Sequence, residues 1–326
     1  MNAAGRLAAF GTGLVVAFAG AYATAAAVVP ESAVANWNEG ANSGDHSTMA
    51  QSSTAAATST TGGSAAGLPG LSLGQDGYVL APVSAPPTAG RPGELTFKIL
   101  RTDGAPVVDY VNKHDKDLHL IAVRSDGTGF QHTHPTLDKA TGTWSTPWTW
   151  DAAGTYRVFA DFTPADVENG PALVLTRNVQ VAGDFAPVTS RSPRTQAQVA
   201  GFTVTLDGNL VAGSPTELTV TVTKDGKPVT TLQPYLGAFG HLVALRDGDL
   251  AYLHVHPEGD EPKPGQNGGP QVKFATDVPT AGRYLLYLDF QVDGQVHTAE
   301  FVVDAARGDA TQPADTSSAG THSGGH

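Results

Sequence analysis

The sequence predicts an all-β fold made of two tandem antiparallel β-sandwich domains. Short runs such as 95–100 and 218–222 alternate apolar and polar residues at period two and are rich in β-formers. Turn residues that tolerate a positive φ angle, Asp103-Gly104 and Asp225-Gly226, follow these runs. Between residues 75 and 305 helix signals are nearly absent, and much of the first half recurs in the second.

The N-terminal segment 1–30 is expected to be a membrane anchor. After Arg6, residues 7–29 carry no charge, and a helix of this length, rising about 1.5 Å per residue, can cross a hydrocarbon core about 30 Å thick. Arg6 would stay inside by the positive-inside rule, so the rest of the chain would lie outside the cytoplasm. The alternative is a signal peptide cleaved near Ala23 or Ala25, which would give a secreted protein.

Composition divides the rest of the chain into five segments. Ser, Thr, Ala and Gly dominate the region after the anchor, and a segment with so few apolar residues cannot offset its ordering entropy. A polar stretch with two prolines separates the two repeated units. The predicted segments are a disordered stalk at 31–74, a first domain at 75–184, a hinge at 185–199, a second domain at 200–305 and a disordered tail at 306–326.

Each domain is expected to contain a tyrosine corner. Residues 153–162 match residues 281–290, and both begin with Ala-Gly-x-Tyr and end with Asp-Phe. A tyrosine at the start of a late strand is typical of immunoglobulin-like domains, although the cysteine found near it in those domains is missing here. A cupredoxin-like sandwich would give nearly the same strand pattern, so periodicity leaves both topologies open.

A repeat without gaps carries the residues with the most specific chemistry. Residues 117–135 align with residues 239–257, and both copies contain His-x12-His-x-His-Pro. Neutral imidazole is a common protein ligand for zinc and copper, and a repeated fold alone does not require histidine at the same three places. The pattern therefore predicts metal binding by His119, His132 and His134 in the first copy, and by His241, His254 and His256 in the second.

The spacing in the first copy allows its three histidines to meet. In a hairpin around the loop 125–128, His119 lies directly opposite His134. His132 is two residues from His134 and projects from the same face of the sheet. Opposed residues have Cβ atoms about 4.5–5.5 Å apart and diagonal neighbours about 7–8 Å, so three imidazoles could surround one ion. A register shift of one residue would move one strand's histidines to the other face.

The second copy predicts the same arrangement, with His241 opposite His256 and His254 beside them. The alternative for both copies is a buried polar network, in which imidazoles bond to one another and to two aspartates that recur in both repeats, Asp161 and Asp289. These aspartates are also weaker candidates for completing a metal shell or for orienting its histidines.

The remaining histidines carry weaker predictions. His297 has no counterpart in the first domain and is a weaker metal candidate. His114 lies in a charged run and is expected to be a solvated loop residue. His322 and His326 could capture copper(II) or nickel loosely, but a disordered tail without a site is the simpler interpretation.

Composition limits both the metal and the partner. The chain has no cysteine, and its only methionines are Met1 and Met49, so thiolate sites, blue-copper ligation, disulfides and a methionine-rich copper(I) site are excluded. The remaining ligands are nitrogen and oxygen, which suit copper(II) or zinc. Asp and Glu outnumber Lys and Arg by 31 to 19, so binding to nucleic acid is not expected.

Several segments carry a family resemblance: the paired His-Leu and His-x-His-Pro segments, the run 235–241 before the second of them, and the pattern Val28-Val-Pro-Glu-Ser32. Together they resemble a group of actinobacterial extracytoplasmic proteins, membrane-anchored or secreted, with tandem β domains. Such domains are similar to modules found beside copper and other heavy-metal handling genes. The resemblance covers both domains and the anchor. It implies metal binding by the same six histidines and implies no enzymatic activity.

These observations predict extracytoplasmic binding of a divalent transition metal, copper(II) or zinc, for buffering, delivery or sensing, with an envelope metal transporter or another envelope protein as partner. Binding is expected to weaken as the pH falls through the imidazole pKa, about 6.5 when unperturbed. The alternative is a non-enzymatic envelope interaction module whose histidines form polar core networks. Three histidines with an open position are what a catalytic zinc uses, but no general base, nucleophile elbow or cofactor loop accompanies them, so an enzyme is not expected.

Overall fold

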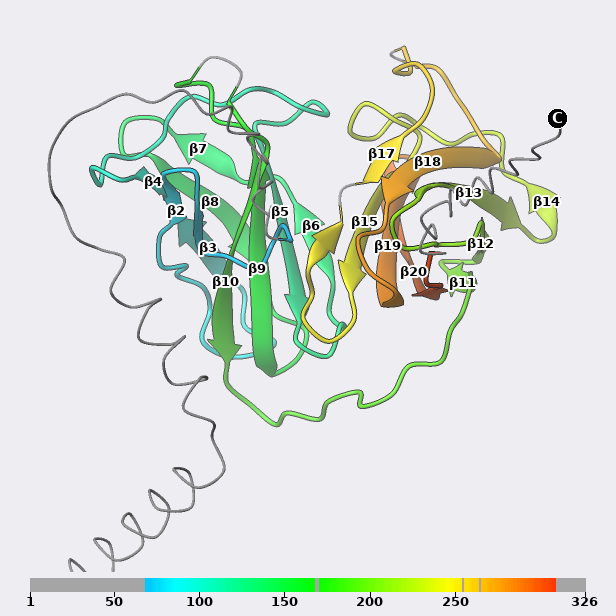
Figure 1. The fold of residues 1–326 in the computed structure, drawn as a ribbon, viewed down its shortest axis with the longest axis horizontal. Helices are drawn as coiled ribbons and strands as arrows, with labels where there is room; N and C mark the ends of the chain where they lie inside the picture. The colour runs from blue at the N-terminus through cyan, green and yellow to red at the C-terminus, as the bar shows by residue number, and fades with distance from the viewer. Residues whose placement is uncertain (1–67, 168–169, 254, 264, 309–326) are drawn as a thin grey trace, which may run out of the picture. The chain divides into compact units, whose positions relative to one another are not determined.

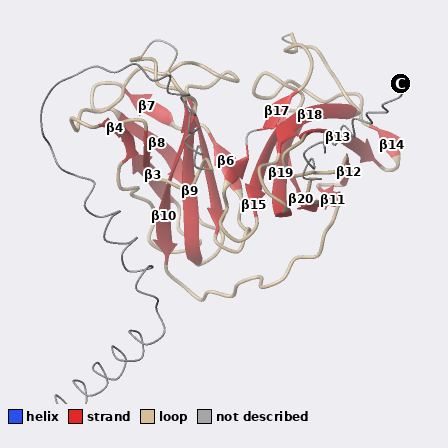
Figure 2. Ribbon diagram, in the orientation of Figure 1, coloured by secondary structure: helices blue, strands red, loops and turns tan. Residues whose placement is uncertain are grey.

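The described part of the chain consists of β-strands and the loops that join them (Figure 1). The computed structural model describes residues 68–167, 170–253, 255–263 and 265–308. Within these residues every regular element is a strand, which confirms the predicted all-β fold (Figure 2). The predicted span at 7–29 lies outside the described residues, as do most of the stalk and of the tail. In the part that is described, no helix is long and apolar enough to cross a membrane.

The first sandwich is built of strands β1 to β10, paired antiparallel. A sheet of order β10-β9-β5-β6 packs against a sheet of order β3-β8-β7 and a small sheet of order β1-β2-β4, around a core that includes Trp144, Trp148 and Trp150. The strands are β1 Gly74–Gln75, β2 Tyr78–Leu80, β3 Gly93–Phe97, β4 Ile99–Arg101, β5 Leu118–Arg124, β6 Gln131–Thr133, β7 Thr136–Asp138, β8 Thr143–Trp148, β9 Gly154–Phe162 and β10 Leu173–Val181.

The second sandwich is built of strands β11 to β20. A sheet of order β16-β15-β19-β20 packs against a larger sheet of order β11-β12-β13-β18-β17, in which β14 also pairs with β13. The strands are β11 Gln196–Val199, β12 Phe202–Asp207, β13 Pro215–Lys224, β14 Lys227–Pro228, β15 His241–Arg246, β16 Tyr252–Leu253, β17 Val255–Pro257, β18 Gln271–Asp277, β19 Gly282–Val292 and β20 Gln295–Ala305. Strand β11 occupies the last part of the predicted hinge, where its alternating Gln-Ala-Gln-Val pairs with β12.

The sheet of each sandwich that carries the first histidine of the repeat is buried on both faces. In β5, Leu120 and Ala122 belong to the core of the first sandwich, whereas Ile121 and Val123 on the opposite face meet residues of the second. Each large apolar side chain buried there contributes about 1.5–3 kcal/mol. The contact between the apolar faces of the two sandwiches is therefore a third hydrophobic core. We call it the inter-sandwich layer; its buried members are Ile121, Val123, Phe159, Val174, Val243, Leu245, Leu250, Tyr252, Leu285, Tyr287 and Val302.

Both predicted tyrosine corners are present. The Tyr156 hydroxyl donates to the carbonyl oxygen of Ala152 at 3.0 Å, and the Tyr284 hydroxyl donates to that of Thr280 at 2.8 Å. In both cases the acceptor is four residues upstream, at the corner that leads into the long strands β9 and β19. This bond is typical of immunoglobulin-like sandwiches and favours that topology over the cupredoxin-like alternative.

The carboxylate of Asp126 connects the β5–β6 loop to the segment between the sandwiches. It accepts hydrogen bonds from Arg124, from the backbone and hydroxyl of Thr128, and from the backbone N–H of Val188 at 2.8 Å. Burial alone would raise the pKa of Asp126, but the bonds from Arg124, Val188 and Thr128 outweigh it and hold that pKa below its usual value. The side chains of Arg124 and Asp126 are 8% and 6% exposed, so neither charge is solvated by bulk water.

Asp126→Asn is expected to destabilise the protein by about 3–5 kcal/mol, because it leaves the Arg124 charge buried without a counter-ion. Urea unfolding at neutral pH measures the change. The matched control is Asp109→Asn, which breaks the exposed Lys139–Asp109 pair and should cost less than about 1 kcal/mol. Equal effects of the two substitutions would contradict the role assigned to Asp126.

Candidate metal centre

The first copy of the histidine repeat folds as the predicted hairpin. Strands β5 and β6 pair Leu120 with Thr133 and Ile121 with His132. Continued by one more pair, this register places His119 opposite His134, as expected from the sequence. His132 and His134 therefore share a sheet face with His119, the face that is turned toward the second sandwich.

The ring nitrogens of these three histidines converge. Nδ1 of His119 lies 3.2 Å from Nε2 of His132 and 3.3 Å from Nε2 of His134. In a tetrahedral zinc site with Zn–N distances of about 2.0–2.1 Å, two ligand nitrogens lie about 3.3–3.4 Å apart. One ligand atom from each histidine lies within 4.8 Å of the other two. The observed spacing therefore suits three ligands of one ion.

The outward nitrogens of two of the rings indicate their tautomers. Nε2 of His119 faces the carbonyl oxygen of Lys113 at 3.3 Å, and Nδ1 of His132 faces a carboxylate oxygen of Asp289 at 2.8 Å. Both partners only accept hydrogen bonds, so these outward nitrogens carry the protons. In the neutral rings, His119 Nδ1 and His132 Nε2 therefore both present lone pairs, 3.2 Å apart. Two facing acceptors are stabilised by a cation, either a proton or a metal ion, or by a third donor such as an Nε2–H group of His134, which lies 3.3 Å from His119 Nδ1.

Burial keeps the imidazoles of His119 and His134 neutral. Burial, followed by the neighbouring His132, lowers the pKa of His119 to about 3. Burial, followed by His132 and His119, likewise lowers the pKa of His134 to about 3. Neutral imidazole is the form that binds metal, so protons compete weakly at these two ligands near neutral pH. For these two ligands, the loss of binding expected from the sequence near pH 6.5 moves to lower pH.

The second sandwich contributes His241 and Asp289 to the same place. These residues face each other across β15 and β19, just as His119 faces Asp161 across β5 and β9. The His241 ring stacks on that of His119, with centroids 5.3 Å apart and planes within 3°, and its centroid is 4.8 Å from that of His132. Asp289 is 2% exposed and also accepts a hydrogen bond from the Thr298 hydroxyl at 2.6 Å. The cluster is therefore shared by both sandwiches.

The second copy of the repeat does not form a matching triplet in the described residues. Strand β16 keeps the predicted register, with Ala244 opposite Leu253, but β17 pairs with β18 in the other sheet and places His256 opposite Ala275. His256 is therefore not paired with His241, contrary to the expectation from spacing. In the first copy the strand changes sheet only after His134. His254 lies outside the described residues.

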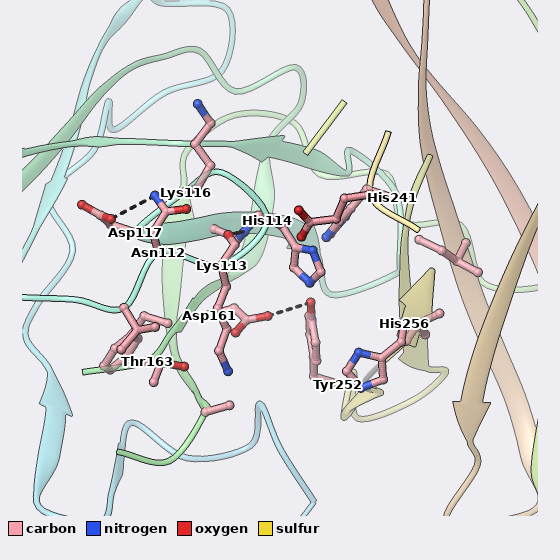
Figure 3. Close-up of a pocket in the computed structure, with 17 residues that line it drawn as sticks. Asn112, Lys113, His114, Lys116, Asp117, Asp161, Thr163, His241, Tyr252 and His256 are labelled. Atoms are coloured by element: carbon pink, nitrogen blue, oxygen red, sulfur yellow. Dashed lines mark hydrogen bonds between the residues drawn. The ribbon is translucent and has the colours of Figure 1, made fainter. Parts of the chain in front are cut away.

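A cavity of ≈ 370 Å³ opens beside the cluster and contains a histidine that the sequence analysis missed (Figure 3). His114 is half-buried rather than solvated, and its ring centroid lies 6.2 Å from that of His119 and 6.1 Å from that of His241. His256 lines the same cavity. The two residues after Lys113 reach this position because both His114 and Asp115 adopt positive φ angles, of 50° and 63°. No periodic pattern signals such a turn.

Two weaker candidates lie apart from the converging nitrogens. Asp161 accepts a hydrogen bond from the Tyr252 hydroxyl at 3.2 Å, as Figure 3 shows, and burial raises its pKa to about 6. His297 packs against Phe202 and Phe290, with ring centroids 5.1 and 5.4 Å away. Phe290 points into the core of the second sandwich, opposite in direction to Asp289. His297 is paired with Phe290, so it lies on the face of the sheet that is turned away from the histidine cluster.

Without metal, the protein is expected to lose stability as the pH falls from about 6.5 toward 3, since folding lowers the pKa values of His119 and His134 to about 3. Below about 6.5 the unfolded chain binds more protons than the folded chain, which costs up to about 1.4 kcal/mol per pH unit for each group. Urea unfolding at pH 7, 6 and 5 measures this slope. It should flatten in His119→Gln/His134→Gln and persist in His297→Gln; equal slopes in all three proteins would refute the assignment.

A family model described as "Domain of unknown function (DUF8832)" matches residues 74–180 and again residues 197–307. No curated protein matches the chain. Domains 4 and 5 of the S-layer protein SbsC are 13% identical, with a TM-score of 0.21 over 65% of this chain and 80% of that one. The fibronectin(III)-like modules of Clostridium thermocellum CbhA are 11% identical, with a TM-score of 0.19 over 76% of this chain and 100% of that one.

Invasin, a bacterial integrin-binding protein, is 12% identical, with a TM-score of 0.20 over 70% of this chain and 38% of that one. The solved structures that resemble the chain thus include domains of an S-layer protein, a bacterial integrin-binding protein and fibronectin(III)-like modules. At these identities and TM-scores no activity or partner carries over to this chain.

Proposed function

The chain belongs to the family described as "Domain of unknown function (DUF8832)", whose model covers most of it in two copies, and we propose that it binds a divalent transition metal in the histidine cluster between its two sandwiches. The observation that carries this proposal is the convergence of His119 Nδ1, His132 Nε2 and His134 Nε2. Copper(II) or zinc is the proposed ion, since both accept imidazole nitrogen, and copper(II) is favoured by intrinsic affinity.

The surroundings of the cluster support metal binding. In the neutral rings the lone pairs of His119 and His132 face each other at 3.2 Å, an arrangement that a metal ion stabilises. Asp289 and the Lys113 carbonyl hold the rings from outside, as carboxylates and carbonyls do for ligating histidines in metal sites. Tyr235 of the second sandwich lies beside His134, with ring centroids 6.3 Å apart, and helps to cover the site.

The site works outside the cytoplasm in this proposal, because the uncharged N-terminal segment is expected to be exported or to anchor the chain. The buried position of the ligands suits holding an ion more than rapid exchange, which favours buffering or sensing. The cavity lined by His114 and His256 gives a route by which an ion could reach the cluster from solvent. An envelope metal transporter remains the proposed partner for delivery.

Calorimetric titration of the full chain with copper(II) or zinc tests the proposal. His46, His322 and His326 are first changed to alanine, so that histidines outside the two sandwiches do not bind copper. Tight binding is expected to be lost in His119→Ala/His134→Ala and retained in His254→Ala/His256→Ala. Absence of binding in the starting protein would overturn the proposal and leave the structural interaction module as the function. Binding that depends only on the second pair would place the site elsewhere.

A further inference from the structure

The two ring nitrogens of His132 face two different groups of donor atoms. Nε2 faces His119 in the triplet described above, at 3.2 Å. Nδ1 faces Asp289 at 2.8 Å, and one ligand atom from each of His132, His241 and Asp289 lies within 4.8 Å of the other two. The two nitrogens of an imidazole point away from each other, so both can bind a metal ion at the same time.

In the second group, the buried carboxylate of Asp289 has no Lys or Arg counter-ion and the buried Nδ1 of His241 has no hydrogen-bond partner, within the described residues. Asp289 is 2% exposed, and within the described residues its side-chain partners are His132 and Thr298, with no ion pair to Lys or Arg. Nδ1 of His241 is buried, and in the part of the chain that the structure describes it has no hydrogen-bond partner. A buried carboxylate and a buried ring nitrogen without partners are both costly, and a cation between them would remove both costs.

We propose that a second metal ion binds His132 Nδ1, His241 and Asp289, so that the His132 ring bridges two ions. This inference rests on the proposed function, because the first ion occupies Nε2 of the same ring. In the neutral ring, the first ion binds the Nε2 lone pair of His132. For the second, the Nδ1–H bond of His132 breaks, the proton leaves to solvent, and the lone pair of the resulting imidazolate binds the ion. The freed Asp289 oxygen and His241 complete its shell.

The charges of the second group suit this step. The imidazolate and the Asp289 carboxylate together carry two negative charges, which a divalent ion neutralises. The other carboxylate oxygen still accepts the bond from Thr298, which holds Asp289 in place. The step requires no oxidant or reductant, since only a proton and a metal ion are exchanged.

Copper(II) titration of the full chain, with His46, His322 and His326 changed to alanine, tests the bridge. Two ions per chain are expected, and the second should release one proton more than the first, measured by calorimetry in buffers of different ionisation enthalpy. The electron paramagnetic resonance signal should grow up to one equivalent and then fall, because the bridge couples the two spins. One ion per chain would overturn the bridge while leaving the proposed function intact. No ion at all would mean that the proposed function itself fails.

Two variants assign the second position. Asp289→Asn keeps an acceptor for His132 but removes the charged ligand, and it should reduce two ions to one while the affinity for that ion changes by less than about 100-fold. His241→Ala should also leave one ion, and serves if the first variant does not fold. A stoichiometry of two that survives both substitutions would overturn the proposal. Wild-type binding of one ion that His241→Ala weakens would make His241 a fourth ligand of a single ion.

Discussion

His132→Ala is expected to lower the affinity for copper(II) or zinc by more than about 100-fold, the largest effect expected for any single substitution in the cluster. Replacing a partner that only orients a ligand costs about 10–100-fold in metal affinity, and a direct ligand must cost more. His132 is also the residue shared by both groups of donor atoms, and its bond to Asp289 joins the two sandwiches. Loss of its ring therefore removes a ligand and loosens its neighbours at once.

Competition with a chromophoric chelator measures the affinity of this variant. The control is His297→Ala, which removes an imidazole from the same protein outside the cluster and should leave the affinity within about twofold, as expected for a side chain that contacts no ligand. Circular dichroism is used to check that both variants fold. An unchanged affinity in folded His132→Ala would show that the three converging nitrogens are not the metal-binding site.

Much of the first half of this site could be predicted from the sequence, because local geometry determines it. The loop after Arg124 determines which residues of β5 and β6 pair, and pairing with period-two side chains then places His119, His132 and His134 on one face. The same reasoning was wrong for His256 because it assumed that both strands of the second hairpin stay in one sheet. Where a strand changes sheet depends on packing against distant strands, which the spacing of histidines does not contain.

The participation of His241 and Asp289 depends on how the two sandwiches pack, and one sequence signal for that packing was present. Strands 118–124 and 241–246 are continuous apolar runs rather than alternating ones, apart from their histidine and arginine. A strand of that composition is typical of a sheet covered on both faces. It indicates that something covers the outer face, and the repeat suggests the other domain. It does not indicate the register in which the two faces meet, so the contact from His132 to Asp289 could not be predicted.

Tyr287→Ala is expected to destabilise both sandwiches, although the residue belongs only to the second. Tyr287 is 1% exposed in the inter-sandwich layer, stacks on Phe130 of the first sandwich at 4.1 Å, and donates from its hydroxyl to the carbonyl of Gly127 at 2.7 Å. Removing a large buried aromatic ring costs about 3–5 kcal/mol. Tyr287→Phe keeps the ring but leaves the carbonyl without its donor, at about 1–3 kcal/mol.

Tryptophan fluorescence during urea unfolding shows whether this loss crosses the layer. In a chain with Trp37 changed to phenylalanine, the remaining tryptophans are Trp144, Trp148 and Trp150. All three lie in the first sandwich, so their signal reports its unfolding alone. A lower midpoint for that signal in Tyr287→Ala means that the second sandwich stabilises the first. An unchanged midpoint would mean that the sandwiches unfold independently.

The same substitution also tests how the ion and the layer cooperate. Because the ligands of the proposed second ion come from both sandwiches, that ion at about 1,000 times its dissociation constant should return about 4 kcal/mol to the folded state, which is comparable to the loss from Tyr287→Ala. If metal fully restores the urea midpoint measured by tryptophan fluorescence, the ion can hold the two sheets together when their apolar contact is weakened. If metal no longer binds Tyr287→Ala at all, the inter-sandwich layer must form first. The ion then binds to ligands whose positions packing has already fixed.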